Sequence, residues 1–148
     1  AELATGERRV TAVGTTSVRT LESLYHIGCL IAQDRWNGNV EQWYPYSEDH
    51  PNIDTRESLK QIVDWLDAEG LDKLVASTRI IIAPGYRYRI VRRMITNFHQ
   101  PGSTLLLLVS AFIGDIWKKV YEHALASDYR FLSYGDACLF SISDDEKQ

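Results

Sequence analysis

Short β-branched runs alternate along this chain with longer stretches in which apolar residues recur at helical spacing. Residues 9–13 are short and β-branched and end at Gly14, which predicts a buried strand. Apolar residues then recur through 18–28 at helical spacing, and the three hydroxyl residues before them are natural helix N-caps. The first predicted unit is therefore a strand, a tight polar turn and a helix.

The next part of the chain is less regular. A strand is one interpretation from Ile31 onward, and Asn37-Gly38 is a strong signal for a hairpin turn between Trp36 and Val40. Prolines in 44–51 then interrupt any regular element. We therefore expect a hairpin or a long loop over residues 29–53.

The pattern becomes regular again after residue 53. A helix is predicted from Asp54 or Thr55 to Gly70, with an apolar face and with a capping-box pattern at its start. Residues 78–83 predict a second buried strand, and 86–95 alternate loosely enough to form a further strand.

The last third contains a polar loop, two helices and a final strand region. The helix predicted over 104–113 is apolar on all sides, so we expect it to be buried from every direction. Asp115 caps a further predicted helix, and residues 130–142 hold one or two strands around a Gly135-Asp136 turn. This order predicts an α/β fold with a mixed or mostly parallel sheet and packed helices.

Composition and charge limit the functional classes. The net charge of -4 does not favour bulk electrostatic binding of nucleic acid, although a local basic patch would still allow it. The two cysteines, Cys29 and Cys138, form no zinc or redox motif, and no His/Cys/Asp cluster has metal-ligand spacing. The longest apolar run, 104–113, is too short to span a membrane, and no signal peptide is visible.

The first candidate motif is VGTTSVRTLE, residues 13–22. Free N–H groups at the start of a helix attract carboxylates and phosphates, and Thr15, Thr16 and Ser17 add hydroxyl groups there. Arg19 can form a bidentate pair with a carboxylate. The alternative is simple N-capping with a solvated Arg19, which spacing alone favours.

The second motif is TNFHQPGST, residues 96–104. Its polar side chains include Thr96, Asn97, Ser103 and Thr104, together with His99, whose ordinary pKa suits proton transfer. The alternative makes Asn97 a turn former, Ser103 a helix cap and His99 a structural histidine. The density of polar groups beside an apolar helix favours a site.

The third motif is YRFLSYGDA, residues 129–137. The ring of Tyr134 can stack on a purine or deazapurine, and Asp136, after Gly135, can accept a hydrogen bond from an amine. The alternative is a strand with aromatic core residues and a type I′ turn.

A fourth feature is a basic stretch with interleaved tyrosines. Its arginines suit phosphate binding and its tyrosines suit base stacking, whereas a solvated strand face paired with acids is an equal alternative. The arginines are Arg87, Arg89, Arg92 and Arg93.

Taken together, these motifs resemble a known family in order and spacing. AVGTTSVRTLE, PGYRYRIVRRMITNFHQPGSTLLLLVSAF and YRFLSYGDA are similar to the C-terminal portion of the S-adenosylmethionine:tRNA ribosyltransferase-isomerases of queuosine biosynthesis, across residues 9–25 and 79–140. The resemblance implies that 1–148 is the C-terminal portion of the catalytic α/β domain of a larger two-domain fold, without its N-terminal half. Residues 29–78 read as a lineage-specific hairpin and helix. Gln100 stands where the family usually has leucine.

The resemblance also implies an activity. Family members transfer and isomerise the ribosyl group of S-adenosylmethionine onto 7-aminomethyl-7-deazaguanine at the tRNA wobble position, giving epoxyqueuosine, adenine and methionine. It implies tRNA as partner, S-adenosylmethionine as co-substrate, no permanently bound cofactor, no metal, no membrane and a cytoplasmic location; the oligomeric state stays open. The isolated chain is expected to be inactive.

The implied chemistry assigns roles to the motifs. His99 is the first choice for the general acid or base, and Asp136 is the second or orients the deazaguanine amine. Residues 15–17 with Arg19 would bind a carboxylate or ribose hydroxyls, and Tyr134 would stack. The alternatives are a non-catalytic tRNA-binding or assembly module, and a nucleotide-binding enzyme of other specificity on the same fold.

Overall fold

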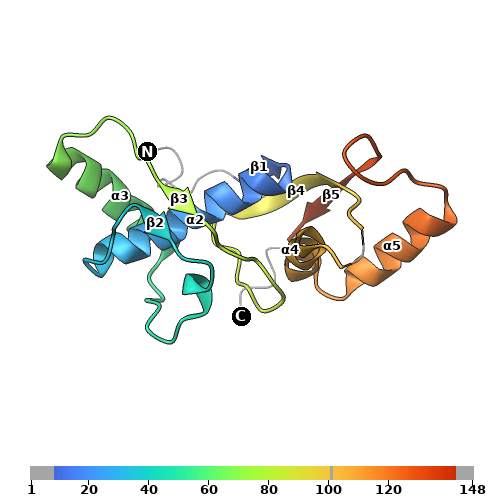
Figure 1. Ribbon diagram of the computed structural model, residues 1–148, viewed down its shortest axis with the longest axis horizontal. Coiled ribbons are helices and arrows are strands. Elements are labelled where there is room, and N and C mark those ends of the chain that lie inside the picture. Colours follow the sequence, from blue (N-terminus) through green and yellow to red (C-terminus); the bar gives the residue numbers. More distant parts are fainter. Residues whose placement is uncertain (1–8, 101, 143–148) are drawn as a thin grey trace. The chain divides into compact units, whose positions relative to one another are not determined.

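The computed structural model describes residues 9–100 and 102–142, and they form two compact units. We call residues 10–18 and 82–142 the sheet unit, and residues 19–81 the helical unit. Helix α2 (Thr15–Ala32) begins in the first and continues into the second (Figure 1). Each unit is described by itself below.

The sheet unit contains a three-stranded mixed sheet in the order β1-β4-β5. Strand β1 (Val10–Val13) pairs in parallel with β4 (Val91–Asn97), and β4 pairs antiparallel with β5 (Ala137–Ser141). Helices α4 (Thr104–Ile113) and α5 (Ile116–Ala126) follow β4 in the chain. The α/β prediction with a mixed sheet is therefore confirmed.

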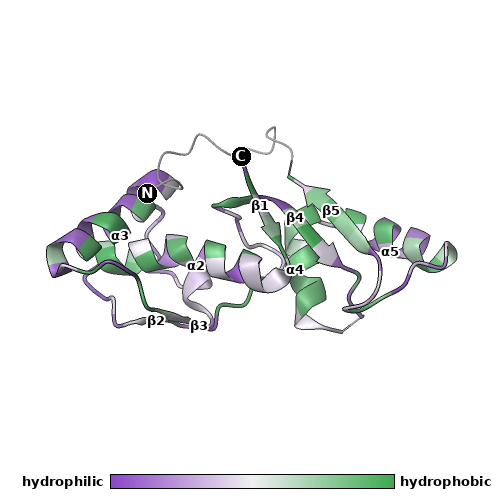
Figure 2. Ribbon diagram, turned by 90° about the horizontal axis from the view of Figure 1, so that it is seen from above, coloured by the Kyte–Doolittle hydropathy of each residue, from purple (hydrophilic) through white to green (hydrophobic). Residues whose placement is uncertain are grey.

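One face of this sheet is buried and the other is open. Ala12, Met94 and Phe140 are buried, whereas Val13 is 65% exposed and Leu139 is 61% exposed. Side chains alternate between the faces of a strand, so the two sets lie on opposite faces. Figure 2 shows hydrophobic residues along all three strands and along α4.

Helix α4 is less enclosed than its composition suggests. Four of its residues are buried, but Leu107 is 39% exposed. The expectation of burial from every direction is therefore wrong for the chain described here. The buried residues are Leu106, Leu108, Val109 and Phe112.

The helical unit contains most of α2, the 3-10 turn η1 (Tyr44–Tyr46), helix α3 (Thr55–Glu69), and the short parallel pair β2 (Asn39–Val40) and β3 (Ser77–Thr78). As predicted, α3 is capped by Asp54, whose side chain accepts hydrogen bonds from the first-turn N–H groups. It ends at Gly70, which has a positive φ of 66°. Such a left-handed residue is a common helix stop.

Several local predictions are wrong. No strand begins at Ile31, because α2 continues to Ala32, and no hairpin forms at Asn37-Gly38, because β2 pairs in parallel with the distant β3. The strand expected over 78–83 is reduced to Ser77–Thr78.

The sheet unit also differs from its local predictions. The strand expected over 86–95 begins only at Val91. The prediction of one or two strands in 130–142 is confirmed by a single strand, β5, which follows the Gly135-Asp136 turn. The segment before that turn is not a strand, so no type I′ hairpin forms there.

Candidate functional site

The sheet brings the ends of three motifs to one edge. Val13 at the end of β1 pairs with Ile95 of β4, and Asn97 at the end of β4 pairs with Ala137 at the start of β5. The carboxyl ends of the parallel strands β1 and β4 therefore meet the turn that leads into β5. In open α/β sheets, ligands bind in the crevice outside the carboxyl ends of the strands.

The first motif forms the turn from β1 into α2. Gly14 has a φ of +82°, which favours glycine, and its N–H donates to the carbonyl of Ile95 at 2.8 Å. Thr15, Thr16 and Ser17 then form the first turn of α2, and Thr16 and Ser17 are exposed. The first N–H groups of a helix have no intrahelical acceptor and attract anions.

Arg19 falls in the helical unit, as the fifth residue of α2. Its Nε atom is buried, and we find no hydrogen-bond partner for it among the described residues. An unsatisfied guanidinium donor is suited to an anionic acceptor, because the charged donor forms stronger hydrogen bonds.

His99 is held at the end of β4 by two contacts. Its Nε2 atom lies 2.9 Å from the hydroxyl of the buried Thr96, and its backbone N–H donates to the hydroxyl of Tyr121 at 3.0 Å. Burial lowers the pKa of His99 below its ordinary value of 6.5. The imidazole is therefore mainly neutral at neutral pH and can accept a proton.

Asn97 connects the second motif to the third. Its side-chain amide donates to the carbonyls of Gly135 and Asp136, at 3.2 and 3.4 Å. The N–H of Leu132 donates to the carbonyl of Phe98 at 2.9 Å. These bonds fasten the loop before β5 to the end of β4.

The loop itself is closed by Asp136. The backbone N–H of Arg130 donates to the Asp136 carboxylate at 2.7 Å, and the Arg130 guanidinium lies 3.6 Å from it. The hydrogen bond from that N–H, with the nearby guanidinium, lowers the pKa of Asp136. A β-carbon on Gly135 would lie 2.3 Å from the Arg130 carbonyl, so this turn requires glycine.

The remaining residues of these motifs have simpler environments. The hydroxyl of Ser103 accepts a hydrogen bond from the N–H of Leu105 at 3.1 Å, so it caps α4, and Thr104 is the first residue of that helix. The side chain of Tyr134 is 98% exposed, which leaves both faces of its ring accessible to solvent. The predicted stacking residue is thus accessible, at the edge that also holds Asn97 and Asp136.

Sequence reasoning missed three residues that shape this edge. Tyr121 of α5 positions the backbone of His99, Arg130 binds Asp136, and the thiol of Cys138 donates to the carbonyl of Thr96 at 3.2 Å. Burial raises the pKa of Cys138 to about 11, so it stays protonated. Tyr121 lies on helix α5, and no local sequence pattern indicates its contact with His99.

The four arginines of the basic stretch differ in their exposure to solvent. Arg87 and Arg93 are exposed, whereas Arg89 and Arg92 are half-buried. The tyrosines between the arginines do not serve as an exposed stacking surface, because Tyr86 and Tyr88 are buried. Base stacking by these tyrosines is therefore a wrong prediction.

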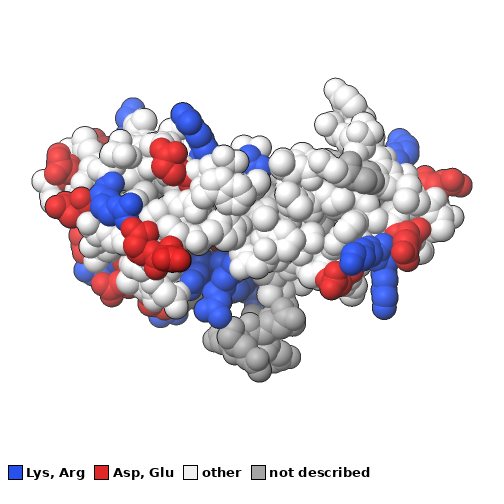
Figure 3. Space-filling model, turned by 60° about the horizontal axis from the view of Figure 1, so that its bottom comes forward, with Lys and Arg blue, Asp and Glu red and all other residues white. Residues whose placement is uncertain are grey.

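The charged surface is mixed. At the left of Figure 3, over the helical unit, acidic and basic side chains are interspersed. Within 9–100 and 102–142, we find no group of three or more His, Cys, Asp or Glu residues arranged to hold a metal ion. No helix in the same ranges is long and apolar enough to cross a membrane.

Comparison with known proteins gives consistent results. A family model described as queuosine biosynthesis protein matches residues 1–140. An S-adenosylmethionine:tRNA ribosyltransferase-isomerase from Azoarcus sp. (strain BH72) is 39% identical over 137 residues, which are 92% of this chain and 28% of the relative. The protein of the same name from Burkholderia mallei (strain SAVP1) is 51% identical over 84 residues, 53% of this chain and 23% of the relative.

A solved structure is also similar. The crystal structure of S-adenosylmethionine tRNA ribosyltransferase from Thermotoga maritima matches with a TM-score of 0.56 and 30% identity, covering 91% of this chain and 34% of that one. The chain thus spans about a quarter to a third of the length of these relatives.

Proposed function

Because the chain belongs to the family of queuosine biosynthesis proteins, we propose that it forms part of a tRNA-modifying transferase-isomerase. The proposed reaction moves and isomerises the ribosyl group of S-adenosylmethionine onto 7-aminomethyl-7-deazaguanine at the tRNA wobble position. Epoxyqueuosine forms, and adenine and methionine are released. The co-substrate binds only for turnover, and we propose a cytoplasmic location, where tRNA is modified.

The main support is the convergence of polar motifs at one edge of the sheet. Residues 15–17, the 96–99 segment and the 134–136 turn reach that edge through the pairings of β1, β4 and β5. Together they provide free N–H groups, a neutral imidazole, a carboxylate and an accessible aromatic ring. Such convergent polar groups are typical of a ligand site.

We propose His99 as the group that transfers protons. The sulfonium of S-adenosylmethionine acidifies the neighbouring 5′ C–H, and loss of that proton needs a neutral base. The lowered pKa of His99 supplies a neutral imidazole at neutral pH. Its Nε2 is engaged by Thr96, and among the described residues we find no partner for Nδ1, which we propose as the proton-accepting atom.

The other proposed roles concern binding. Asp136 stays ionised and fixed in its turn, so it suits orientation of the deazaguanine amine better than proton removal. Tyr134 stacks on the base. The N–H groups and hydroxyls of 15–17 bind the methionine carboxylate or the ribose, with Arg19 as a further anion ligand and Ser103 and Thr104 at a second helix start.

A chimera tests the proposal. This chain would replace the matched 137 residues of the Azoarcus relative, and adenine release would be measured with S-adenosylmethionine and a tRNA carrying the aminomethyl-deazaguanine. We expect adenine release by the chimera and none by the isolated chain, which spans 28% of that relative. A folded chimera that binds tRNA but neither binds S-adenosylmethionine nor releases adenine would instead favour a tRNA-binding module.

A further inference from the structure

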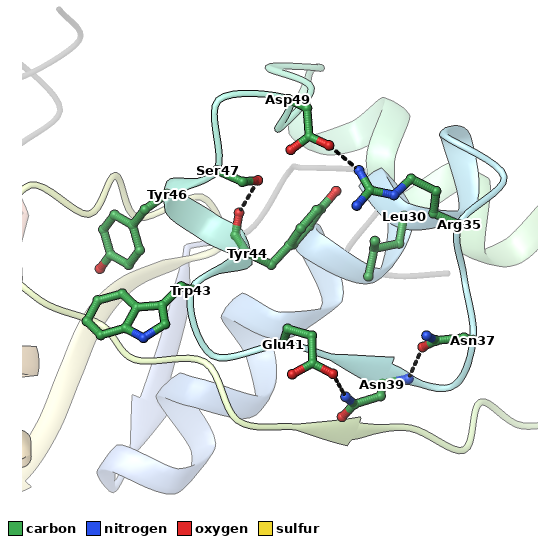
Figure 4. Close-up of a pocket in the computed structure, with 10 residues that line it drawn as sticks. All are labelled: Leu30, Arg35, Asn37, Asn39, Glu41, Trp43, Tyr44, Tyr46, Ser47 and Asp49. Carbon is green, nitrogen blue, oxygen red and sulfur yellow. Dashed lines mark hydrogen bonds and ion pairs between the residues drawn. The ribbon is translucent and has the colours of Figure 1, made fainter.

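The helical unit contains a pocket that the proposed reaction does not use. The pocket has a volume of about 470 Å³, within the range of small-molecule sites. In Figure 4, Trp43 and Tyr46 lie at the left, and the ring of Tyr44 lies between them and the Arg35–Asp49 ion pair. A row of polar side chains lies below. The lining residues are Leu30, Arg35, Asn37, Asn39, Glu41, Trp43, Tyr44, Tyr46, Ser47 and Asp49.

The aromatic residues of the pocket differ in burial and in how firmly they are held by neighbouring residues. Tyr44 is buried and packs against His50, with ring centroids 4.8 Å apart, and its hydroxyl donates to Gln33 at 2.8 Å. Trp43 is 60% exposed and packs against Tyr46 at 5.9 Å between ring centroids. One ring is thus fixed, while Trp43 presents a broad surface to an incoming group.

Two acceptor atoms on the polar side of the pocket have no partner among the described residues. Arg35 forms an ion pair with Asp49, so its charge is already compensated. One carboxylate oxygen of Glu41 accepts from the amide of Asn39, and we find no partner for the other among the described residues. The Oδ1 atom of Asn39 is buried and also has no partner there.

These features define the chemistry of a ligand. The three charged side chains of the lining, Arg35, Glu41 and Asp49, carry one positive and two negative charges, so the pocket has a net charge of -1. Aromatic faces attract cations, and a guanidinium is planar, stacks on rings and pairs with a carboxylate through two parallel N–H donors. We propose that this pocket binds a guanidinium group, stacked on Trp43 and paired with Glu41.

Binding can be followed on the 148-residue chain through the indole N–H signal of Trp43, assigned with Trp43→Phe. The probes are methylguanidinium, its neutral isostere methylurea, and the tripeptide acetyl-Gly-Arg-Gly-amide. We expect a saturable shift with methylguanidinium at about millimolar Kd, the range for a fragment with few contacts. Tighter binding of the tripeptide would assign the site to a polypeptide arginine, and equal or weaker binding to a free small cation.

Matched variants separate the pocket from the surrounding charge. Glu41→Gln keeps the shape of the side chain but removes its charge, and should weaken binding by about 3- to 10-fold. Glu48 lies in the same loop, and its carboxylate is exposed and does not line the pocket. Glu48→Gln removes this charge and should leave the Kd unchanged. Equal affinity for methylurea, an unchanged Kd in Glu41→Gln, or absence of a saturable shift would overturn the proposal.

Discussion

At His99, burial and positioning act on the same side chain. Desolvation lowers the pKa of the imidazole, while Thr96 fixes its Nε2 and Tyr121 fixes its backbone. A neutral, positioned imidazole is what the proposed role of general base requires at working pH.

The proposed catalytic role of His99 is tested in the chimera. His99→Gln keeps hydrogen bonding but cannot shuttle a proton, so adenine release should fall by about 10²–10⁴-fold. Binding of S-adenosylmethionine should change much less, because the loss lies in the transition state. His123→Gln, which changes an exposed histidine of α5, is the control. Near-normal turnover of His99→Gln would make the histidine structural.

His99 also predicts a pH dependence of stability for the chain itself. Its folded pKa lies below the ordinary 6.5, so the unfolded state binds the proton more tightly. The contribution is fully present above pH 6.5 and is lost as the pH falls through the folded pKa. In thermal unfolding between pH 7 and 5, His99→Gln should lose less stability than the parent chain. Parallel curves for the two proteins would contradict the assignment.

At the scale of elements, the contact between α2 and α3 depends on a glycine. A β-carbon on Gly28 would lie 2.0 Å from the carbonyl oxygen of Ser58 and 2.3 Å from its hydroxyl. The hydroxyl of Ser58 in turn donates to the carbonyl of Tyr25. The start of α3 therefore rests directly on the α2 backbone, a spacing that no other residue allows.

Gly28→Ala should consequently destabilise the helical unit. Helix propensity alone would favour alanine by about 1 kcal/mol, but forcing a backbone contact apart costs about 1–3 kcal/mol. Because the obstructing atom is a backbone carbonyl oxygen, we expect a net loss of up to about 2 kcal/mol in urea unfolding. Thr20→Ala, at an exposed position of the same helix, should stay within about 0.5 kcal/mol. A stabilised Gly28→Ala would show that the helices separate freely.

Elements with a strong local signal were predictable from the sequence. The helix from Thr55 to Glu69 has an apolar face, an Asp54 cap and a Gly70 stop, and all three are confirmed. The positions of strand β1 and helix α4 were likewise predictable, because a β-branched run and an apolar stretch after a cap have few alternatives. The expected burial of β1 is wrong, since Ala12 is its one buried residue. The α/β class followed from their order.

Elements that depend on distant partners were not predictable. Strands β2 and β3 are two residues each and exist because Asn39 pairs with Ser77, 38 positions away. The candidate site shows the same limit. His99 and Asp136 stand out in the sequence as chemically useful residues, but Tyr121, which binds the backbone N–H of His99, lies on the separate helix α5. Its contact is tertiary, so no periodicity or motif around it carries the signal.

At the scale of the whole chain, the net charge of -4 means that the proposed tRNA binding depends on local charge. The proposed contacts are Arg87, Arg89, Arg92 and Arg93, of which the first and last are exposed. Phosphate binding by exposed arginines releases counterions, whereas half-buried arginines contribute less contact with a polyanion. The exposed pair should therefore dominate the salt dependence.

Replacing Arg87 and Arg93 with glutamine in the chimera should weaken tRNA binding. The slope of log affinity against log salt concentration should decrease in magnitude by about one unit per lost phosphate contact. Replacing Arg89 and Arg92 should have a smaller effect on that slope. Arg56→Gln with Lys73→Gln removes the same charge from exposed positions of the helical unit and tests for a general charge effect. If the Arg56 and Lys73 control reduces the slope equally, tRNA binding responds to net charge alone. The basic stretch would then be a solvated strand face, which is the alternative interpretation of these arginines.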